Sequence, residues 1–124
     1  MKTYKFLISI VVVSIIFNSC SYKICNISLG RYINKNDQSV INYIDLAKDG
    51  TYVHYYRKDT VVLSQDGYWK KSKEDNCIIE LENWKSFNEG GEKYEVYGIY
   101  LLYLQGDYLN NGPDGNTSTS FKKD

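Results

Sequence analysis

The stretch KDGTYVHYY, residues 48–56, joins a tight-turn signal to a strand rich in tyrosine. The Asp-Gly pair at 49–50 supplies the positive φ angles that a tight hairpin requires. Side chains alternate between the two faces of a strand, so every second residue after the turn shares a side. The stretch therefore predicts a hairpin whose second strand has one aromatic face. The two faces are Tyr52, His54 and Tyr56 on one side, and Val53 and Tyr55 on the other.

Signals of the same kind continue on both sides of this stretch. Residues 40–46 and 76–83 alternate as half-buried strands do, and residues 92–105 are long enough for two strands bent at Gly98. Residues 118–123 predict a last strand with Phe121 pointing inward. The inward residues expected in the first two segments are Val40, Ile44 and Leu46, then Cys77, Ile79 and Leu81, with Ile78, Glu80 and Glu82 outward.

Turn signals punctuate these segments at short intervals, and the chain has a single alanine, Ala47, and a single proline, Pro113. Tyrosine and β-branched residues suit a pleated surface, and scarce alanine disfavours helices. We therefore predict an all-β fold, an antiparallel meander that forms a small barrel or half-barrel. The further turn signals are Asp66-Gly67, Gly90-Gly91, Gly106-Asp107, Asn111-Gly112 and Asp114-Gly115.

Two segments are less regular. KDGTY at 48–52 is echoed by QDGYW at 65–69, which predicts two similar hairpins rather than a repeat protein, because repeats need several units. ENWKSFNEGG at 82–91 is compatible with a short helical turn or with a loop whose Trp84 and Phe87 cap the core.

Part of this pattern resembles a known family. Gly30-Arg31-Tyr32, Leu46 followed by Asp49-Gly50-Thr51-Tyr52, Gly67-Tyr68-Trp69 and Ile79-Glu80-Leu81 follow the order of motifs in lipocalin-like small lipoproteins. The resemblance covers roughly residues 29–82 and implies a meandering antiparallel barrel or half-barrel for residues 29–124. Such families include many members without a known ligand, so the resemblance implies a fold more than an activity.

The N-terminus predicts secretion. Lys2 and Lys5 precede an apolar run from Phe6 to Phe17, which is too short for a spanning helix and has the layout of a signal peptide; an uncut signal anchor is the alternative. FNSC at 17–20 resembles a bacterial lipobox of the relaxed kind found in Bacteroidetes, although Phe17 and Asn18 depart from the strictest pattern.

The resemblance implies cleavage before Cys20 and lipid on its sulfur, with several acyl chains giving a stable anchor. Residues 1–19 are then the signal peptide and residues 20–28 a lipidated tether. Ser21 in place of Asp, and a tether without an acidic cluster, imply an outer-membrane lipoprotein that faces the periplasm.

Composition excludes some classes of partner. Removing residues 1–19 removes two lysines and leaves 13 basic and 15 acidic residues, a net charge of −2. No Lys/Arg-rich stripe is present to neutralise phosphates, so we expect no nucleic-acid binding. The remaining cysteines, Cys25 and Cys77, are enough for one disulfide, although Cys77 also fits as a small buried residue in its strand.

No catalytic, metal or cofactor motif is visible. His54 is the only histidine, and a lone histidine in a tyrosine-rich strand is more typical of a packed or surface residue than of an acid or base. Glu80 and Glu82 share a strand face, in principle a carboxylate pair for sugar chemistry but more typical of a solvated surface. NNGPDGN at 110–116 offers oxygen ligands but lacks the distal Glu of a calcium loop, which favours a polar hairpin loop.

The aromatic residues are the remaining clue to function. They either line a barrel mouth and bind a ligand or fill the interior, as small barrels require. The candidate ligand-binding residues are Tyr52, His54, Tyr56, Trp69, Trp84 and Tyr100.

We expect a non-enzymatic binding module for a small apolar ligand or an envelope partner, with an apolar cavity open at one end. The alternative is an inhibitor or immunity protein that blocks an envelope hydrolase with a rigid loop, such as 86–92 or 110–116. A small hydrolase is the third reading, and it needs an acidic pair in a cleft.

Overall fold

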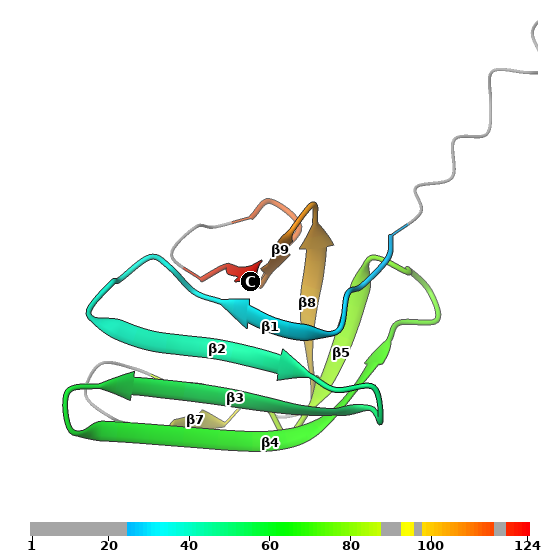
Figure 1. The fold of residues 1–124 in the computed structure, drawn as a ribbon. Coiled ribbons are helices and arrows are strands. Elements are labelled where there is room, and N and C mark those ends of the chain that lie inside the picture. The colour runs from blue at the N-terminus through cyan, green and yellow to red at the C-terminus, as the bar shows by residue number, and fades with distance from the viewer. Residues whose placement is uncertain (1–24, 88–92, 96–97, 116–118) are drawn as a thin grey trace, which may run out of the picture.

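The computed structural model describes residues 25–87, 93–95, 98–115 and 119–124 (Figure 1). The described residues form strands and connecting turns with no helix, which confirms the all-β prediction. The predicted signal peptide, residues 1–19, and Cys20 lie outside the described residues. The strands are β1 (Gly30–Ile33), β2 (Val40–Leu46), β3 (Thr51–Lys58), β4 (Val61–Lys71), β5 (Ile78–Glu82), β6 (Lys85–Phe87), β7 (Lys93–Glu95), β8 (Ile99–Gln105), β9 (Tyr108–Asn110) and β10 (Phe121–Lys123).

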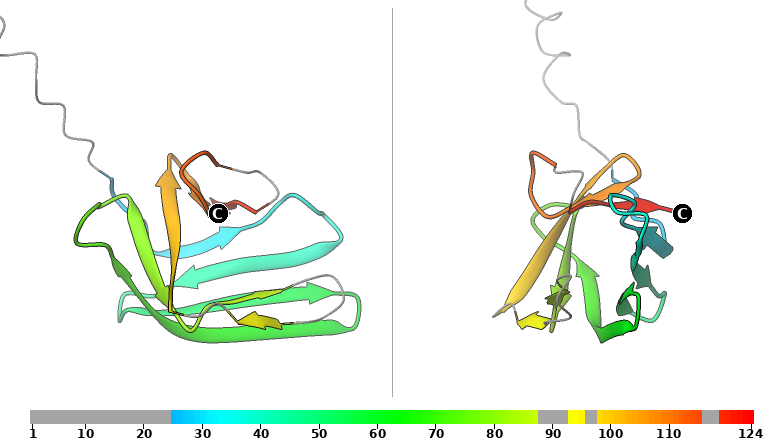
Figure 2. Two further views of the ribbon diagram at one scale, coloured as in Figure 1. Left: turned by 180° about the vertical axis from the view of Figure 1, so that it is seen from behind. Right: turned by 90° about the vertical axis from the view of Figure 1, so that its left-hand side faces the viewer.

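Eight of the described strands close into an antiparallel barrel in the order β1-β10-β9-β8-β5-β4-β3-β2. Consecutive strands pair as hairpins except at two places. β1 pairs with β10, with Tyr32 opposite Lys123, and this pairing closes the barrel. β5 pairs with β8, because β6 and β7, which lie between them in the sequence, are not part of the barrel sheet. β6 and β7 form a separate two-stranded hairpin (Figure 2).

The predicted alternation is confirmed in β2, where Ile44 and Leu46 are buried, and in β3 and β5. Tyr52, His54 and Tyr56 of β3 are all buried, and β5 buries Ile79 and Leu81 while Glu82 is exposed. Such alternation gives the wall one apolar face, and closure turns that face inward. The packed core consists of Tyr32, Ile44, Leu46, Tyr52, Ile79, Leu81, Trp84, Leu102, Leu104, Leu109 and Phe121.

The Asp66-Gly67 turn prediction is wrong. Both residues lie inside β4, and the β3–β4 hairpin turns instead at Asp59 and Thr60, with Asp59 at φ 52°. Gly67 is required for a different reason. A Cβ there would lie 2.5 Å from the Glu82 carbonyl oxygen and 2.9 Å from the Tyr52 ring. Glycine allows this close approach of backbone and side chain.

Replacing Gly67 with alanine is therefore expected to lower the free energy of unfolding by about 1–3 kcal/mol, the usual cost of overpacking. Gly112→Ala is the matched control, because no atom lies within 4 Å of its Cβ position. Urea unfolding of both variants measures the difference. Equal stabilities would show that Gly67 is not held in a tight contact.

Two further predictions need correction. Residues 82–91 were expected to form a helical turn or a loop, but Lys85–Phe87 form β6, which pairs with β7. The last strand begins at Phe121 rather than Ser118, which is not described, and Phe121 is buried as expected. The 92–105 segment does divide at Gly98, which has φ 86° and lies between β7 and β8.

A disulfide joins Cys25 to Cys77, with 5.0 Å between their Cα atoms. Cys25 and Ile27, both within the predicted tether, pack against the core. The hydroxyl of Tyr32 donates a hydrogen bond to the Ser28 carbonyl at 2.7 Å. The chain is thus attached to the barrel from Cys25 onward, five residues before β1 begins.

Candidate functional site

Four rings are stacked in a row inside one end of the barrel. The order is Phe87, His54, Trp84 and Tyr100, with ring centroids 4.4, 4.2 and 5.0 Å apart and interplanar angles of 18°, 5° and 2°. The rings come from β6, β3, the β5–β6 link and β8. Stacked aromatic rings contribute beyond their buried area. The stack therefore fixes the β5–β8 connection against the inner face of β3.

The His54 ring is also held by hydrogen bonds at both nitrogens. Its Nδ1 lies 2.9 Å from the Lys85 carbonyl oxygen, and its Nε2 lies 2.9 Å from Oδ1 of Asn42. A carbonyl only accepts, so Nδ1 carries the proton and donates to Lys85. Burial lowers the pKa of His54 to about 4, so the ring is neutral at pH 7. A neutral Nε2 is an acceptor like Oδ1 of Asn42, so this contact becomes a hydrogen bond when the Asn42 amide is assigned the other way round, with Nδ2 toward the ring.

This burial makes stability depend on pH. His54 has a pKa of 6.5 when unfolded and about 4 when folded, so below pH 6.5 the unfolded chain binds a proton that the folded chain rejects. Stability is then lost as pH falls from 6.5 to 4, by about 3 kcal/mol at 1.36 kcal/mol per pKa unit. Urea unfolding at pH 7 and pH 4 measures the free energy of unfolding lost on acidification. This loss should be larger by about 3 kcal/mol in the unchanged protein than in His54→Gln. Equal losses in the two proteins would contradict the neutral, buried ring.

A cavity of about 190 Å³ lies beside the stack and is partly open to solvent. Three asparagines, a serine and a threonine supply its polar lining, and the rings supply the rest. No charged side chain is among the described residues that line it. The polar group is Asn34, Asn42, Ser86, Asn111 and Thr119, and the rings are His54, Trp84, Phe87, Tyr100 and Phe121.

The six residues expected to bind ligand are not gathered in one place. His54, Trp84 and Tyr100 line the cavity. Tyr52 and Tyr56 do not, and are 1% and 4% exposed. The hydroxyl of Tyr52 donates to the Glu82 carbonyl at 2.6 Å, which anchors the start of the β5–β6 link. Trp69 is half-buried, and its Nε1 donates to the Ala47 carbonyl at 2.9 Å near the β2–β3 turn.

The polar lining of the cavity was not predicted from the sequence. One signal was present, since Asn42 occupies an inward position between Val40 and Ile44, where alternation calls for an apolar residue. A polar residue on a core face indicates a hydrogen-bonding task. Asn34, Asn111 and Thr119 lie outside strands, and only closure of the barrel brings their loops together.

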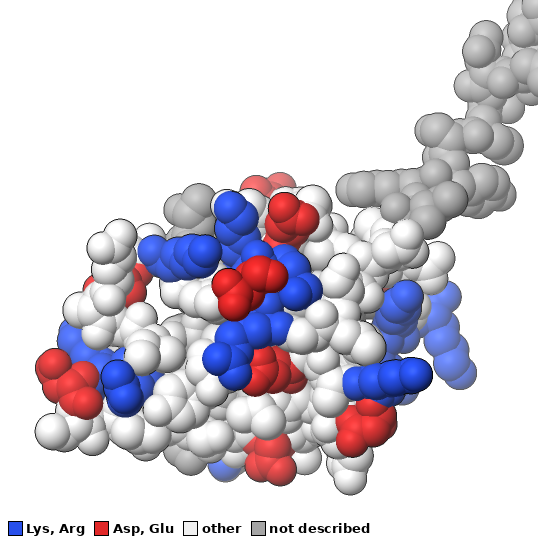
Figure 3. Space-filling model, viewed as in Figure 1, with Lys and Arg blue, Asp and Glu red and all other residues white. Residues whose placement is uncertain are grey.

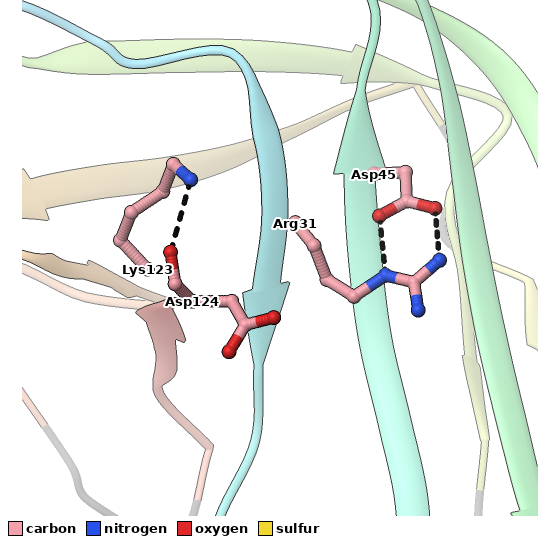
Figure 4. Close-up of polar contacts among 4 residues, drawn as sticks. All are labelled: Arg31, Asp45, Lys123 and Asp124. Atoms are coloured by element: carbon pink, nitrogen blue, oxygen red, sulfur yellow. Dashed lines mark hydrogen bonds and ion pairs between the residues drawn. The ribbon is translucent and has the colours of Figure 1, made fainter.

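Other polar groups lie away from the cavity. On the outer face of β1 and β2, Arg31 donates to both carboxylate oxygens of Asp45 at 2.8 Å, and this bonding raises the pKa of Arg31 (Figure 4). The guanidinium also lies 3.7 Å from the centroid of the Tyr43 ring, which stacks on Tyr55. Acidic and basic side chains are intermixed on the face shown in Figure 3. These contacts join strands on the outside of the wall.

The described residues show no grouping suited to metal binding or to a carboxylate mechanism. No cluster of three His, Cys, Asp or Glu side chains occurs among them. Glu80 lies 3.6 Å from Lys70 across β4 and β5, and neither Glu80 nor Glu82 lines the cavity. Within the same residues, no helix has the length and apolarity needed to cross a membrane.

Comparisons with protein-family models, with curated proteins and with solved structures found no match.

Proposed function

We propose that this chain is a lipid-anchored, non-enzymatic binding module of the cell envelope that takes a small uncharged ligand in the cavity beside His54. The observation that carries the proposal is the lining. Five uncharged polar side chains and a neutral histidine face a space bounded by aromatic rings, with no charge among the described lining residues.

The lining narrows the class of ligand. Amide and hydroxyl side chains both donate and accept hydrogen bonds, and rings offer flat apolar faces. Several of these side chains already bond within the protein, as Thr119 does to Asn111 at 3.0 Å, and a ligand with hydroxyl or amide groups can add to these hydrogen bonds. A wholly apolar ligand would use none of the remaining hydrogen-bonding capacity of the lining. The cavity is smaller than the roughly 300–1,000 Å³ of pockets for drug-sized ligands. The ligand that fits is therefore a single neutral ring bearing hydroxyl or amide groups, or one such group of a larger partner.

Native mass spectrometry of the full-length protein, extracted gently from its own membranes, tests the ligand. We expect an added mass of hundreds of daltons beyond the lipid. Asn111→Trp, at an exposed position lining the cavity, should remove that mass, whereas Asn36→Trp, exposed but not part of the lining, should retain it. A ligand mass retained in Asn111→Trp, or absent from the unchanged protein, would contradict binding in this cavity.

The anchor is tested separately. Cys20→Ala should leave the protein soluble or uncut, because the acyl chains that hold it are lost. Ser21→Ala is the matched control and should remain with the membrane fraction. Unchanged membrane fractionation of Cys20→Ala would overturn the proposed anchor.

A second function, blocking an envelope hydrolase, is supported by the described first part of the loop after β9, residues 111–115. Nε2 of Gln105 donates to the Pro113 carbonyl, and Nδ2 of Asn110 donates to Oε1 of Gln105 at 2.8 Å. Loops tied in this way keep one shape, as inhibitory loops must. The other loop predicted from the sequence spans residues 86–92, and residues 88–92 lie outside the described residues.

Removing residues 112–115 tests this function. If the loop binds an enzyme, a protein complex seen by native mass spectrometry should disappear while the barrel still unfolds cooperatively in urea. A complex that survives the deletion would exclude this loop as the contact.

A further inference from the structure

The cavity and the attachment of residues 25–28 lie at different ends of the barrel. Strand β1 begins at Gly30, next to the attached residues 25–28, and ends at Ile33, directly before Asn34 of the cavity lining. The cavity and the point where the chain joins the barrel therefore lie at opposite ends of β1. Figures 1 and 2 show the same separation, with the β1–β2 loop and the entering chain at opposite ends of the molecule.

The disulfide sets the length of chain between the barrel and Cys20. Cys25 is bonded to Cys77, the residue before β5, so the chain is fixed to the wall there. Four residues, 21–24, then lie between Cys20 and the fixed point, which makes five steps along the chain. An extended chain spans at most about 3.6 Å per residue, so this tether reaches about 18 Å. Counted from Gly30 instead, the ten residues would reach about 36 Å.

The barrel is longer than the tether. β4 has 11 residues, which at about 3.3 Å per residue extend about 36 Å along the strand. Strands in a barrel tilt by about 35–45°, so this corresponds to about 25–30 Å along the barrel axis. If the cavity end faced the membrane, the disulfide end would lie roughly that far from the surface, beyond the reach of the tether.

We propose that the Cys25–Cys77 disulfide orients the barrel on its membrane, with the disulfide end toward the lipid and the cavity opening away from it. This inference rests on the proposed lipidation of Cys20. It assigns the ligand to the aqueous space beyond the protein, as a soluble molecule or a group on a hydrated polymer, and not to the bilayer that carries the anchor.

The orientation is mechanical rather than electrostatic. The β4–β5 link beside Cys77 carries Lys73, Glu74 and Asp75, all exposed. Lys70 and Lys71 precede it, and Lys70 is paired with Glu80, so three lysines face three carboxylates here and give little net attraction to anionic lipid. The disulfide then determines the orientation of the barrel by shortening the tether. Without it, a tether of up to ten residues is long enough to let the barrel turn over.

Energy transfer to the bilayer tests this orientation. The full-length lipidated protein is placed in liposomes of neutral lipid containing a headgroup-linked acceptor dye. A donor dye is introduced through an unnatural side chain either at Glu74, in the disulfide end, or at Asn36, in the β1–β2 loop at the cavity end. Transfer should be several-fold stronger from position 74 than from position 36.

The matched comparison is the double variant Cys25→Ser/Cys77→Ser, which keeps the lipid and lengthens the tether. In this protein the difference between the two positions should shrink toward equality. Equal transfer in the unchanged protein, with the lipid mass present on Cys20, would contradict the orientation alone. Absence of the lipid mass would contradict the proposed anchor and the orientation with it.

Discussion

Trp84→Ala should lower the free energy of unfolding by about 3–5 kcal/mol, the usual range for removing a buried tryptophan. Trp84 is 3% exposed and packs with both ring faces, against His54 at 4.2 Å and Tyr100 at 5.0 Å. Its Nε1 donates to Oγ of Ser86 at 3.1 Å. The substitution removes two stacking contacts and a hydrogen bond, and leaves a cavity where three elements meet.

Urea unfolding of the variant measures this loss. Trp69→Ala is the control, because Trp69 is only half-buried and lies at the edge of the core. It should lose clearly less stability than Trp84→Ala. Trp84→Phe should fall between the unchanged protein and the alanine variant, since it keeps a ring in the stack. Equal losses for the two alanine variants would show that the stack adds nothing beyond ordinary burial.

Loss of the disulfide has the second large expected effect. Cys25 and Cys77 are 52 residues apart, and the loop-entropy model gives about 4 kcal/mol for closing a loop of that length in the unfolded chain. In this model the disulfide stabilises the protein by lowering the conformational entropy of the unfolded chain. The folded barrel should therefore keep its strands when the bond is absent. Cys25→Ser/Cys77→Ser should therefore unfold at much lower urea while its far-ultraviolet circular dichroism stays unchanged.

The measurement is best made with Cys20→Ser in both proteins, which removes the third thiol and prevents exchange. Adding a reductant to the protein with the disulfide should reproduce the loss seen in the double variant. A loss below about 1 kcal/mol would show that residual structure already restricts the unfolded chain without the disulfide.

The strands were predictable where local alternation is strong. β2 was expected over residues 40–46 and is found there, and the inward side of β3 follows from its spacing. The Asp66-Gly67 turn prediction failed because a contact between residues distant in the sequence decides the role of the glycine. Asp66-Gly67 carries a turn signal, yet Gly67 is needed for its contact with Glu82, 15 residues away. Local sequence cannot distinguish a glycine that turns from one that makes room.

The site was less predictable than the fold for the same reason. His54 depends on Asn42, Trp84 and Lys85, from three elements, and its neutral state follows from their packing. Closure of the barrel pairs residues about ninety positions apart, and no short window of sequence contains that pairing. The sequence left the Cys25–Cys77 bond open because spacing alone does not fix a disulfide.

The pairing of β1 with β10 has a consequence for how the protein is made. The residues of the strand that completes the barrel, Phe121–Lys123, are synthesised about ninety positions after those of its partner β1. Until they are free, the growing chain has two unpaired sheet edges and cannot close. Contacts of such high order also form slowly, in milliseconds to seconds for many β proteins. The topology therefore delays closure of the barrel until β10 has been synthesised and is free to pair with β1.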